Sequence, residues 1–575
     1  MPENKYLTID KDSFPYTFIK NVDIPLKTYE KGLLRANVFL PKDAAPFGDK
    51  TYPVIATKSW EQLNPDMKST HSAWETPDPA FWTSKGYIVL RVDERGAGQS
   101  PGFLDTMSRG TSEAFFDVIE WAAEQEWSSG KVGLLGISYY AGTQWRVAAR
   151  KPKGLAAIIP WEGMSDYYRD RVRHGGILSD RFIDFWWNNG VSPCQYGKPG
   201  RSARSWGEDT LEGDLDEETL LKNRRDQTVD TAVHRFRDED YYRTRDFDVE
   251  AIEVPLLSVA NWGGILLHLR GNVLGWIRAS SKYKFLHFII GRHDLPFYYP
   301  ESAELQLSFF NSFLKGDDKD GWKSGKQPRV HLTLRKGEAG VDDPERERGF
   351  PSRDEADWPL PGTNYTRFYL TSDNSLSTTP SSLVNTIEYD ALNGEPIRFA
   401  YKTSSTLEIT GHIVAHLTVA ASRKSADAIP PSDIDLFITL RKINAGGEEV
   451  FYTGTMGDPV PIVKGWQRVS LRKVDESNSL HKEYLPYRNY YSSDVQSVEE
   501  NHKYEVDVEV WPTNVVLEPE ETLVLEIAGH DTQGVGKFSH EHPDDRNSNI
   551  FDGKNIITVG GKASWITLPV IDVRR

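Results

Sequence analysis

Residues 133–142 read GLLGISYYAG, an apolar run that ends at Ser138 and is followed at once by the helix-forming residues 143–149. A short apolar run of this kind is typical of a buried strand, so Ser138 is expected at a strand-to-helix turn. A turn this tight needs small residues near the serine, and Gly136 and Ala141 meet that need. The turn also brings backbone N–H groups of the helix N-terminus close to the serine hydroxyl. We interpret this segment as a nucleophile elbow.

One position of the elbow departs from the generic G-x-S-x-G pattern. That pattern has a glycine two residues after the serine, where this chain has Tyr140. A serine that precedes a helix can also serve simply as its N-cap. The local residues therefore leave two interpretations of Ser138 open, a nucleophile and a capping residue.

The sequence around the elbow alternates strand-like and helix-like stretches. Short apolar, β-branched runs are typical of buried parallel strands, and residues 113–123 repeat their apolar side chains at helical spacing. The strand-like runs occupy residues 52–57, 87–92, 132–136, 155–159, 254–260 and 285–290. This order predicts an α/β fold built on a doubly wound parallel sheet.

Two further regions differ in texture from the sheet. Residues 165–250 are polar, aromatic and helix-forming, which favours a cap inserted over the C-terminal edge of the sheet. From about residue 365 the apolar residues alternate with period two, as expected of a separate β-sandwich. A chain of 575 residues is too long for one core, since single cores stop growing near about 250–300 residues. We expect the first part of the α/β domain, the cap, the second part of the α/β domain and the sandwich at 1–164, 165–250, 251–350 and 365–575.

The composition disfavours several classes of partner. A formal net charge of -16 repels phosphate backbones and anionic lipids, so we expect neither a nucleic-acid nor a membrane partner. Cys194 is the only cysteine, so no intrachain disulfide can form. Residues 1–20 have no apolar core like that of a secretory signal, and no run of about 20 apolar residues could span a bilayer. We expect a cytoplasmic protein that acts on a small molecule, and leave a homo-oligomer open.

The sequence contains no motif for a nucleotide or a metal. It has no P-loop, no dinucleotide-binding G-x-G-x-x-G after a strand, no H-E-x-x-H and no Cys/His cluster. We therefore expect neither a cofactor nor a metal ion.

Several motifs resemble those of one enzyme family. Residues 136–139 (GISY) resemble the G-x-S-Y-x-G elbow of the CocE/NonD-type α/β-hydrolases, which include cocaine esterase, α-amino acid ester hydrolases and X-Pro dipeptidyl-peptidases. That family tolerates a large residue at the position of Tyr140. Residues 93–102 (DERGAGQSPG) resemble its D-x-R-G-x-G-x-S-x-G turn. Further similar segments lie at 127–133, 410–411, 433–437 and 510–513.

This resemblance covers nearly the whole chain. It implies an α/β-hydrolase sheet with an inserted helical cap, closed by a C-terminal β jelly-roll sandwich. It also implies that Ser138 is the nucleophile of a serine hydrolase.

An activated serine needs a base within hydrogen-bond reach and a third group that orients the base. In α/β-hydrolases the base follows the last strand of the sheet. His293 directly follows the strand-like run 285–290, so we predict it as the base. His268 is the reserve, because it is expected to pack in a helix.

The orienting acid is where the sequence departs from the family. Relatives carry an aspartate just after the strand equivalent to 254–260, but residues 261–264 read NWGG here. The neighbouring strand carries Glu162 at its end, and we predict Glu162 as the acid. Asp166 is the second choice. Both could instead pair with a nearby arginine, and a Ser–His dyad without a carboxylate also stays open.

An oxyanion hole needs two donors aimed at the developing charge. The backbone N–H of Tyr139 is the first predicted donor. The family takes the second from a tyrosine after the strand equivalent to 52–57, but residues 58–61 read KSWE. We predict the indole N–H of Trp60 in that role, with the hydroxyl of Ser59 as the alternative.

Aromatic residues on segments that should face the cleft favour a bulky or aromatic acyl group. We predict Tyr140, Trp161 and Trp187 as substrate contacts, although each residue could instead belong to the core.

The sequence thus predicts a serine hydrolase that cleaves an ester, lactone or amide bond through an acyl-enzyme, with esters favoured over peptides. Two alternatives stay open. The first is a non-hydrolytic catalyst of cyclisation, isomerisation or C–C cleavage in secondary metabolism, motivated by the missing aspartate and tyrosine. The second is a catalytically inactive protein that binds a small molecule.

Overall fold

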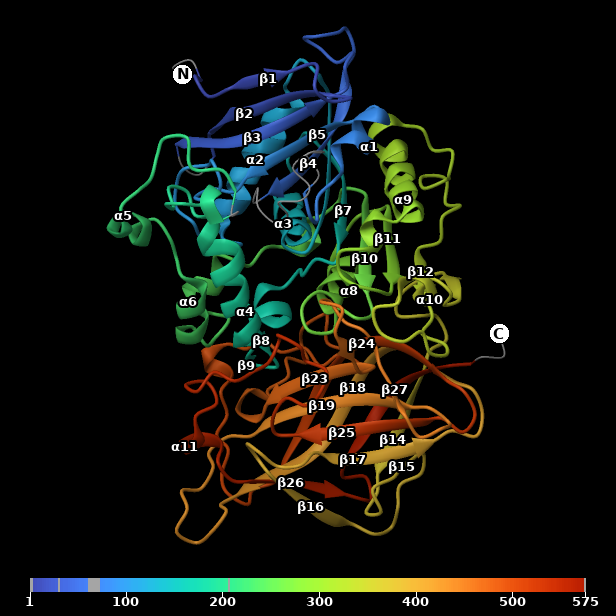
Figure 1. Ribbon diagram of the computed structural model, residues 1–575. Helices are drawn as coiled ribbons and strands as arrows, with labels where there is room; N and C mark the ends of the chain where they lie inside the picture. Colours follow the sequence, from blue (N-terminus) through green and yellow to red (C-terminus); the bar gives the residue numbers. More distant parts are fainter. Residues whose placement is uncertain (1–3, 29–30, 60–72, 205–206, 573–575) are drawn as a thin grey trace.

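The computed structural model describes residues 4–28, 31–59, 73–204 and 207–572, and it contains two large sheets (Figure 1). Within the described residues the first sheet has 11 strands. In spatial order they are β1 (Thr8–Asp10), β2 (Thr17–Leu26), β3 (Gly32–Leu40), β5 (Ile88–Asp93), β4 (Tyr52–Ser59), β6 (Ser128–Ile137), β7 (Leu155–Trp161), β10 (Leu256–Asn261), β11 (Lys284–Ile289), β12 (Val330–Thr333) and β13 (Ser352–Glu355).

The strands from β5 to β12 run parallel, and antiparallel strands extend the sheet at both edges. Alternate residues of a central strand pack on opposite faces. In β4, Val54 and Ala56 join the apolar cluster of α2 (Arg109–Ala123), α3 (Tyr139–Ala148) and α8 (Leu269–Arg278). Ile55 joins the cluster of α1 (Pro79–Ser84) and α9 (Pro300–Phe310) on the other face. Helices on both faces explain why these strands are continuous apolar runs.

A long insertion separates β7 from β10. It contains a π-helical turn at Tyr167–Val172 and a short hairpin of β8 (Arg173–His174) and β9 (Ile177–Leu178). Its α-helices are α4 (Asp180–Trp186), α5 (Glu217–Lys222), α6 (Gln227–Val233) and α7 (Asp240–Arg243). Figure 1 shows α4 and α6 between the first sheet and the second, so this insertion is the helical cap.

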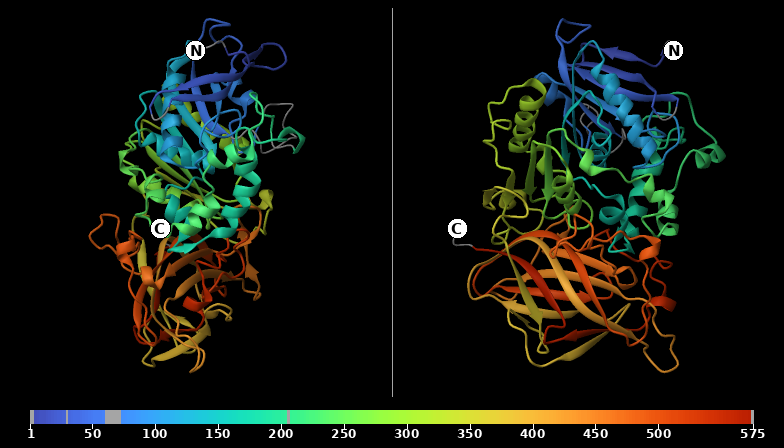
Figure 2. Two further views of the ribbon diagram at one scale, coloured as in Figure 1. Left: turned by 90° about the vertical axis from the view of Figure 1, so that its left-hand side faces the viewer. Right: turned by 180° about the vertical axis from the view of Figure 1, so that it is seen from behind.

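The second sheet forms an antiparallel β-sandwich at one end of the molecule (Figure 2). Its main path runs through β15 (Leu376–Ser377), β14 (Asn364–Leu370), β27 (Trp565–Ile571), β18 (Leu407–Ser422), β24 (Tyr504–Leu517), β23 (Val463–Arg468), β19 (Asp435–Ile443), β25 (Thr522–Ala528) and β17 (Ile397–Lys402). The predicted fold class, an α/β-hydrolase sheet with a cap and a C-terminal sandwich, is confirmed. The domain limits given above stay predictions.

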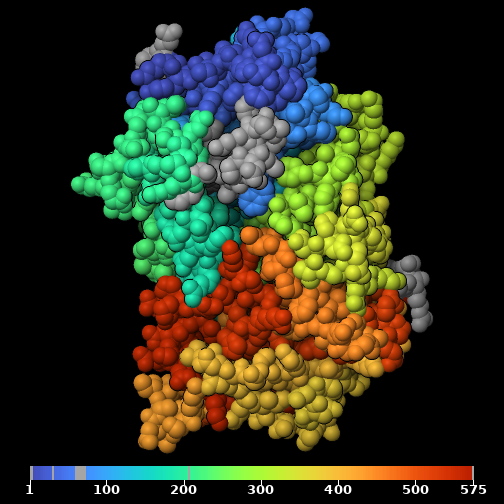
Figure 3. Space-filling view, in the orientation of Figure 1, coloured from blue at the N-terminus to red at the C-terminus, as the bar shows by residue number. Residues whose placement is uncertain are grey.

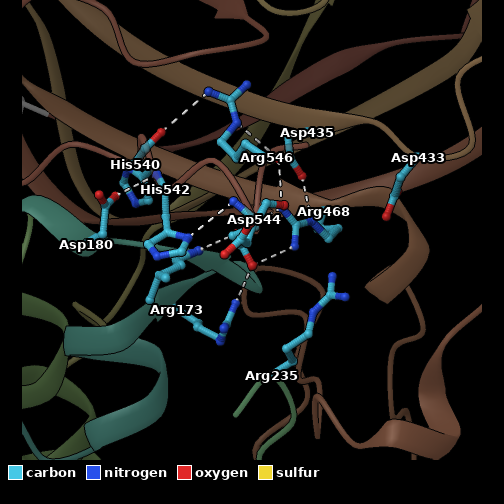
Figure 4. A network of polar contacts seen from close by, with 12 residues as sticks. Arg173, Asp180, Arg235, Asp433, Asp435, Arg468, His540, His542, Asp544 and Arg546 are labelled. Atoms are coloured by element: carbon cyan, nitrogen blue, oxygen red, sulfur yellow. Dashed lines mark hydrogen bonds and ion pairs between the residues drawn. The ribbon is translucent and has the colours of Figure 1, made fainter. Parts of the chain in front are cut away.

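The C-terminal sandwich touches both the cap and the second half of the first sheet (Figure 3). A buried ion-pair network joins the cap to the sandwich (Figure 4). Arg173 of β8 donates to Asp545 at 2.7 Å, and Arg468 of β23 donates to both Asp545 and Asp435. The side chains of Arg173 and Asp545 are almost entirely excluded from solvent, at 0% and 2% exposure. Removing one partner of a buried ion pair is strongly destabilising, because the other charge is left without compensation.

We expect Arg173→Met to cost about 3–5 kcal/mol of stability, since Asp545 would lose one of its two buried cationic partners. The readout is the urea midpoint of unfolding followed by tryptophan fluorescence. Arg181→Met is the matched control: Arg181 also links the cap to the sandwich, but its ion pair with Glu541 is exposed. That change should cost about 1 kcal/mol or less. Equal shifts in the two variants would contradict the assignment of the buried network as the main link.

Candidate active site

Ser138 lies at the junction of β6 and α3 in a strained conformation, with φ 60° and ψ -119°. Its backbone N–H donates to the carbonyl oxygens of Trp161 (3.2 Å) and Glu162 (3.0 Å) at the end of β7. The close approach of α3 to β7 requires glycine at position 163, because a Cβ there would lie 2.4 Å from the Cβ of Ala141. These contacts give the strand–turn–helix geometry of a nucleophile elbow.

The side chain of Ser138 contacts a histidine from the neighbouring strand connection. Its Oγ lies 3.3 Å from Nε2 of His268, the residue that precedes α8. His268 is buried, and its ring stacks on that of His293 with centroids 5.0 Å apart and planes within 8°. Among the described residues, Nδ1 of His268 has no hydrogen-bond partner.

Two glutamates hold His293, which follows β11. Nδ1 of His293 lies 2.9 Å from Oε2 of Glu162, and Nε2 lies 3.1 Å from Oε1 of Glu75. All three side chains are buried. Glu162 also accepts a hydrogen bond from Asn261 at 3.1 Å. Two stacked imidazoles thus make different contacts: His268 contacts Ser138, and His293 contacts the carboxylates of Glu162 and Glu75.

The environment drives the pKa values of the two histidines apart. Burial lowers the pKa of His293, but the negative charges and hydrogen bonds of Glu162 and then Glu75 outweigh it and raise the pKa to about 10. Burial, and after it the charges of His293 and Arg171, lower the pKa of His268 well below its ordinary value. Burial also raises the pKa values of Glu75 and Glu162. At neutral pH His293 is therefore charged and His268 is neutral.

Glu162 lies beside the segment 261–264, where the resemblance implied an aspartate. A Cβ built on Gly264 would lie 3.7 Å from Oε2 of Glu162. Asp166, the second choice from the sequence, accepts hydrogen bonds from the backbone and the guanidinium of Arg169. The carboxylate that the structure brings to His293 from the predicted pair is thus Glu162.

Glu75 has no motif in the sequence that could have singled it out. It lies just after the segment 60–72, which is outside the described residues, and it has a left-handed backbone conformation with φ 63°. Its backbone carbonyl accepts a hydrogen bond from the N–H of Ile137 at 3.1 Å, which fixes it beside the elbow. His268 was identifiable from the sequence, but its contact with Ser138 depends on the path of the 262–268 loop.

The predicted oxyanion donors are placed only in part. The N–H of Tyr139 belongs to the first residue of α3, directly after the serine. The phenol of Tyr139 points away to donate to Glu94 at 3.0 Å, and it accepts from the N–H of Met107. Trp60 lies outside the described residues, and so does the side chain of Ser59.

A cavity of about 170 Å³ opens beside Ser138. Its walls are mostly aromatic and apolar. The lining residues include Trp74, Tyr139, Tyr140, Phe182, Phe185, Trp186, Arg171, Thr455 and Met456, together with Glu75, His268 and His293.

The three predicted substrate contacts differ in their placement. Tyr140 lines the cavity, but Trp161 and Trp187 do not. Trp161 is buried on the other face of the sheet, where its ring packs on Phe297 with centroids 5.4 Å apart. Trp187 is buried in the core, and its neighbour Trp186 lines the cavity instead. For Trp161 the reason is the strand alternation, which directs successive side chains to opposite faces.

Two features are absent from the described part of the chain, a cluster of potential metal ligands and a helix that could cross a membrane. Within it, no group of three or more His, Cys, Asp or Glu side chains is arranged to hold a metal ion. None of its helices combines the length and the apolar character needed to cross a bilayer.

An elbow on a parallel sheet, under a helical cap, defines the α/β-hydrolase class. Comparison with known proteins narrows this class. Residues 32–293 match the X-Pro dipeptidyl-peptidase (S15) family, and residues 321–567 match the C-terminal non-catalytic domain of X-Pro dipeptidyl-peptidases. The chain belongs to the CocE/NonD-type α/β-hydrolases, a family of serine hydrolases.

Individual relatives agree with this membership. Cocaine esterase from Rhodococcus sp. is 28% identical in an alignment of 395 positions, which covers 63% of this chain and 64%, less than two thirds, of that enzyme. A CocE/NonD family hydrolase from Staphylococcus aureus has a TM-score of 0.80 at 27% identity, over 97% of this chain and 94% of that one. An α-amino acid ester hydrolase shares the fold, with a TM-score of 0.68 at 15% identity over 99% of both chains.

We expect Glu162→Gln to lower the pKa of His293 from about 10 toward its ordinary value, because Glu162 makes the largest contribution that raises it. Titration of ¹³Cε1-labelled histidines by NMR measures the shift. Glu75→Gln is the matched comparison and should lower this pKa by less. A His293 that titrates near 6.5 in the native protein would contradict the geometry.

The same shift makes folding depend on pH. The folded-state pKa of His293 is above the unfolded value of about 6.5, so its proton stabilises the fold fully below pH 6.5. That contribution is lost as the pH rises through about 10. The midpoint temperature of thermal unfolding should therefore fall more steeply between pH 7 and pH 10 for the native protein than for His293→Gln.

Proposed function

We propose that this protein is a serine hydrolase that cleaves an ester or amide bond of a small, bulky or aromatic acyl substrate through an acyl-enzyme on Ser138. One observation carries the proposal: Ser138 sits on a strained turn at the wall of an aromatic cavity, with its Oγ 3.3 Å from a neutral imidazole. Backbone strain of this kind persists only where the surroundings enforce it, and it is concentrated at functional sites.

We assign the role of general base to His268. A base must be uncharged before it can take a proton, and it must lie within reach of the hydroxyl. His268 meets both conditions, whereas His293 is already protonated at neutral pH and its Nε2 is engaged with Glu75. This assignment differs from the sequence-based choice of His293, because the sequence could not show that two carboxylates would hold that ring.

The carboxylate pair has an electrostatic role in this proposal. When His268 takes the proton of Ser138, two imidazolium rings lie stacked 5.0 Å apart, and their repulsion opposes the transfer. Glu162 and Glu75 supply two negative charges beside these two positive charges. The pair therefore stabilises the charge that develops on His268.

The remaining steps follow from the elbow. Ser138 attacks the carbonyl carbon, and the N–H of Tyr139 at the positive end of α3 stabilises the oxyanion. Trp60 stays the candidate for the second donor. His268 then gives its proton to the leaving group, and water attacks the acyl-enzyme with His268 again as the base.

Ester hydrolysis is the preferred reaction in this proposal. The similarity to cocaine esterase, which extends over 63% of the chain, supports this preference. The cavity is also predominantly apolar, which suits an acyl or aryl group better than a charged peptide N-terminus.

The test is intact-mass labelling with a fluorophosphonate. The native protein should gain one adduct, and Ser138→Ala should gain none. We expect His268→Gln to slow labelling by about 10²–10⁴-fold, since general-base catalysis supplies a factor of this size. His331→Gln, at a partly exposed position on β12, is the control and should label at the native rate.

The outcomes distinguish the open alternatives. A stronger effect of His293→Gln than of His268→Gln would return the base role to His293. A protein that never labels would overturn the serine hydrolase and leave the small-molecule binder. Incorporation of oxygen from ¹⁸O-labelled water into the product separates hydrolysis from cyclisation or isomerisation, which add no oxygen from solvent.

A further inference from the structure

Arg171 is a buried cation in the wall of the Ser138 cavity. It belongs to the π-helical turn at Tyr167–Val172, where the cap leaves the sheet. Only 5% of Arg171 is exposed, and the residue lines the same cavity as Ser138 and His268. Its charge is close enough to His268 to lower the pKa of that ring.

The contacts of Arg171 do not balance its charge. Its guanidinium lies over the ring of Trp186 at 4.5 Å and that of Phe182 at 5.6 Å. The hydrogen bond that its Nη2 donates to Oε1 of Gln227 is long, at 3.4 Å. Within the part of the chain that the structure describes, no carboxylate forms an ion pair with Arg171.

The neighbouring buried arginines, unlike Arg171, form ion pairs with carboxylates. Arg169 pairs with Asp166, Arg173 pairs with Asp545, and Arg270 pairs with both Asp170 and Glu509. The same small region of the cap thus neutralises these cations within the protein. Arg171, the one that reaches the cavity, is the exception among them.

A buried charge without a counterion is costly, so its presence calls for a partner. Guanidinium is planar, weakly hydrated and suited to hold a carboxylate through two parallel hydrogen bonds. The rings of Phe182 and Trp186 contact the guanidinium of Arg171 but carry no negative charge to balance it. The unsatisfied charge is therefore available to a molecule in the cavity.

We propose that Arg171 binds a carboxylate of the substrate, so that the substrate of Ser138 is an ester whose apolar or aromatic body carries a negative charge away from the scissile carbonyl. This inference rests on the proposed function and narrows its substrate class. The substrate carboxylate also offsets the charge that depresses the basicity of His268, so an anionic substrate favours its own proton transfer.

The experiment compares two esters that differ only in charge. The p-nitrophenyl monoester of glutarate ends in a carboxylate, and the corresponding ester of glutaramate ends in a neutral amide of nearly the same shape. The native protein should prefer the anionic ester by kcat/KM. We expect the preference ratio to fall by about 100-fold in Arg171→Met, since truncating one partner of a buried charge pair has an effect of this size. Arg171→Lys should retain part of the preference.

The matched control is Arg243→Met, which removes an exposed cap arginine and should leave the ratio unchanged. Equal losses on both esters in Arg171→Met would assign Arg171 a structural role and overturn the inference. A native protein that favours the neutral ester would overturn it without any variant.

A separate readout keeps the two proposals apart. Fluorophosphonate labelling of Ser138 reports on the proposed function alone. Calorimetric binding of glutarate against glutaramide, its neutral diamide, reports on Arg171 alone, because it requires no turnover. Labelling without selective glutarate binding would overturn the inference about Arg171 and leave the proposed hydrolase standing. Selective binding without labelling would overturn the proposed hydrolase and leave the carboxylate-binding role of Arg171 standing.

Discussion

The close packing of β6, α3 and the end of β7 at Ser138 is the constraint on which the rest of the structure depends. The N–H of Ser138 reaches two carbonyl oxygens at the end of β7, while α3 starts immediately and packs against Gly163. Neither contact tolerates a larger residue at position 163 or a relaxed turn at position 138. The same packing places Glu162 at the end of β7 with its carboxylate toward β11. The strained turn and the acid that holds His293 are thus products of one packing arrangement.

The polar cluster around the serine behaves as a single electrostatic unit. His268 and His293 share a stacked arrangement, yet burial keeps the first neutral while the flanking carboxylates keep the second charged. Two rings of the same chemical type are thereby given different protonation states at one pH. Such separation of pKa values is the usual means by which neighbouring groups receive different roles in a site.

Much of the fold could be predicted from the sequence, because buried parallel strands are conspicuous. The run predicted at 155–159 lies within β7, and that at 285–290 overlaps β11. The antiparallel strands β1 to β3 were not predicted, although β2 alternates between buried and partly buried residues and β3 is mostly buried. At the site, local sequence indicated Ser138 and the strand ends indicated Glu162 and His293. The positions of Glu75 and His268 depend on loop paths, which no periodicity encodes.

Residues of both large domains line the cavity beside Ser138. Thr455 and Met456 of the sandwich form part of its wall, and Thr455 accepts a hydrogen bond from the N–H of His293 at 3.1 Å. The segment that carries Arg171 is flanked by Arg169, which donates to the carbonyl of Arg488, and by Arg173, which pairs with Asp545. The α/β domain without the sandwich would lack both this part of the cavity wall and the contacts of Arg169 and Arg173. A substitution at Thr455 or Met456 can therefore change the shape of the cavity, although both residues lie more than 300 positions along the chain from Ser138.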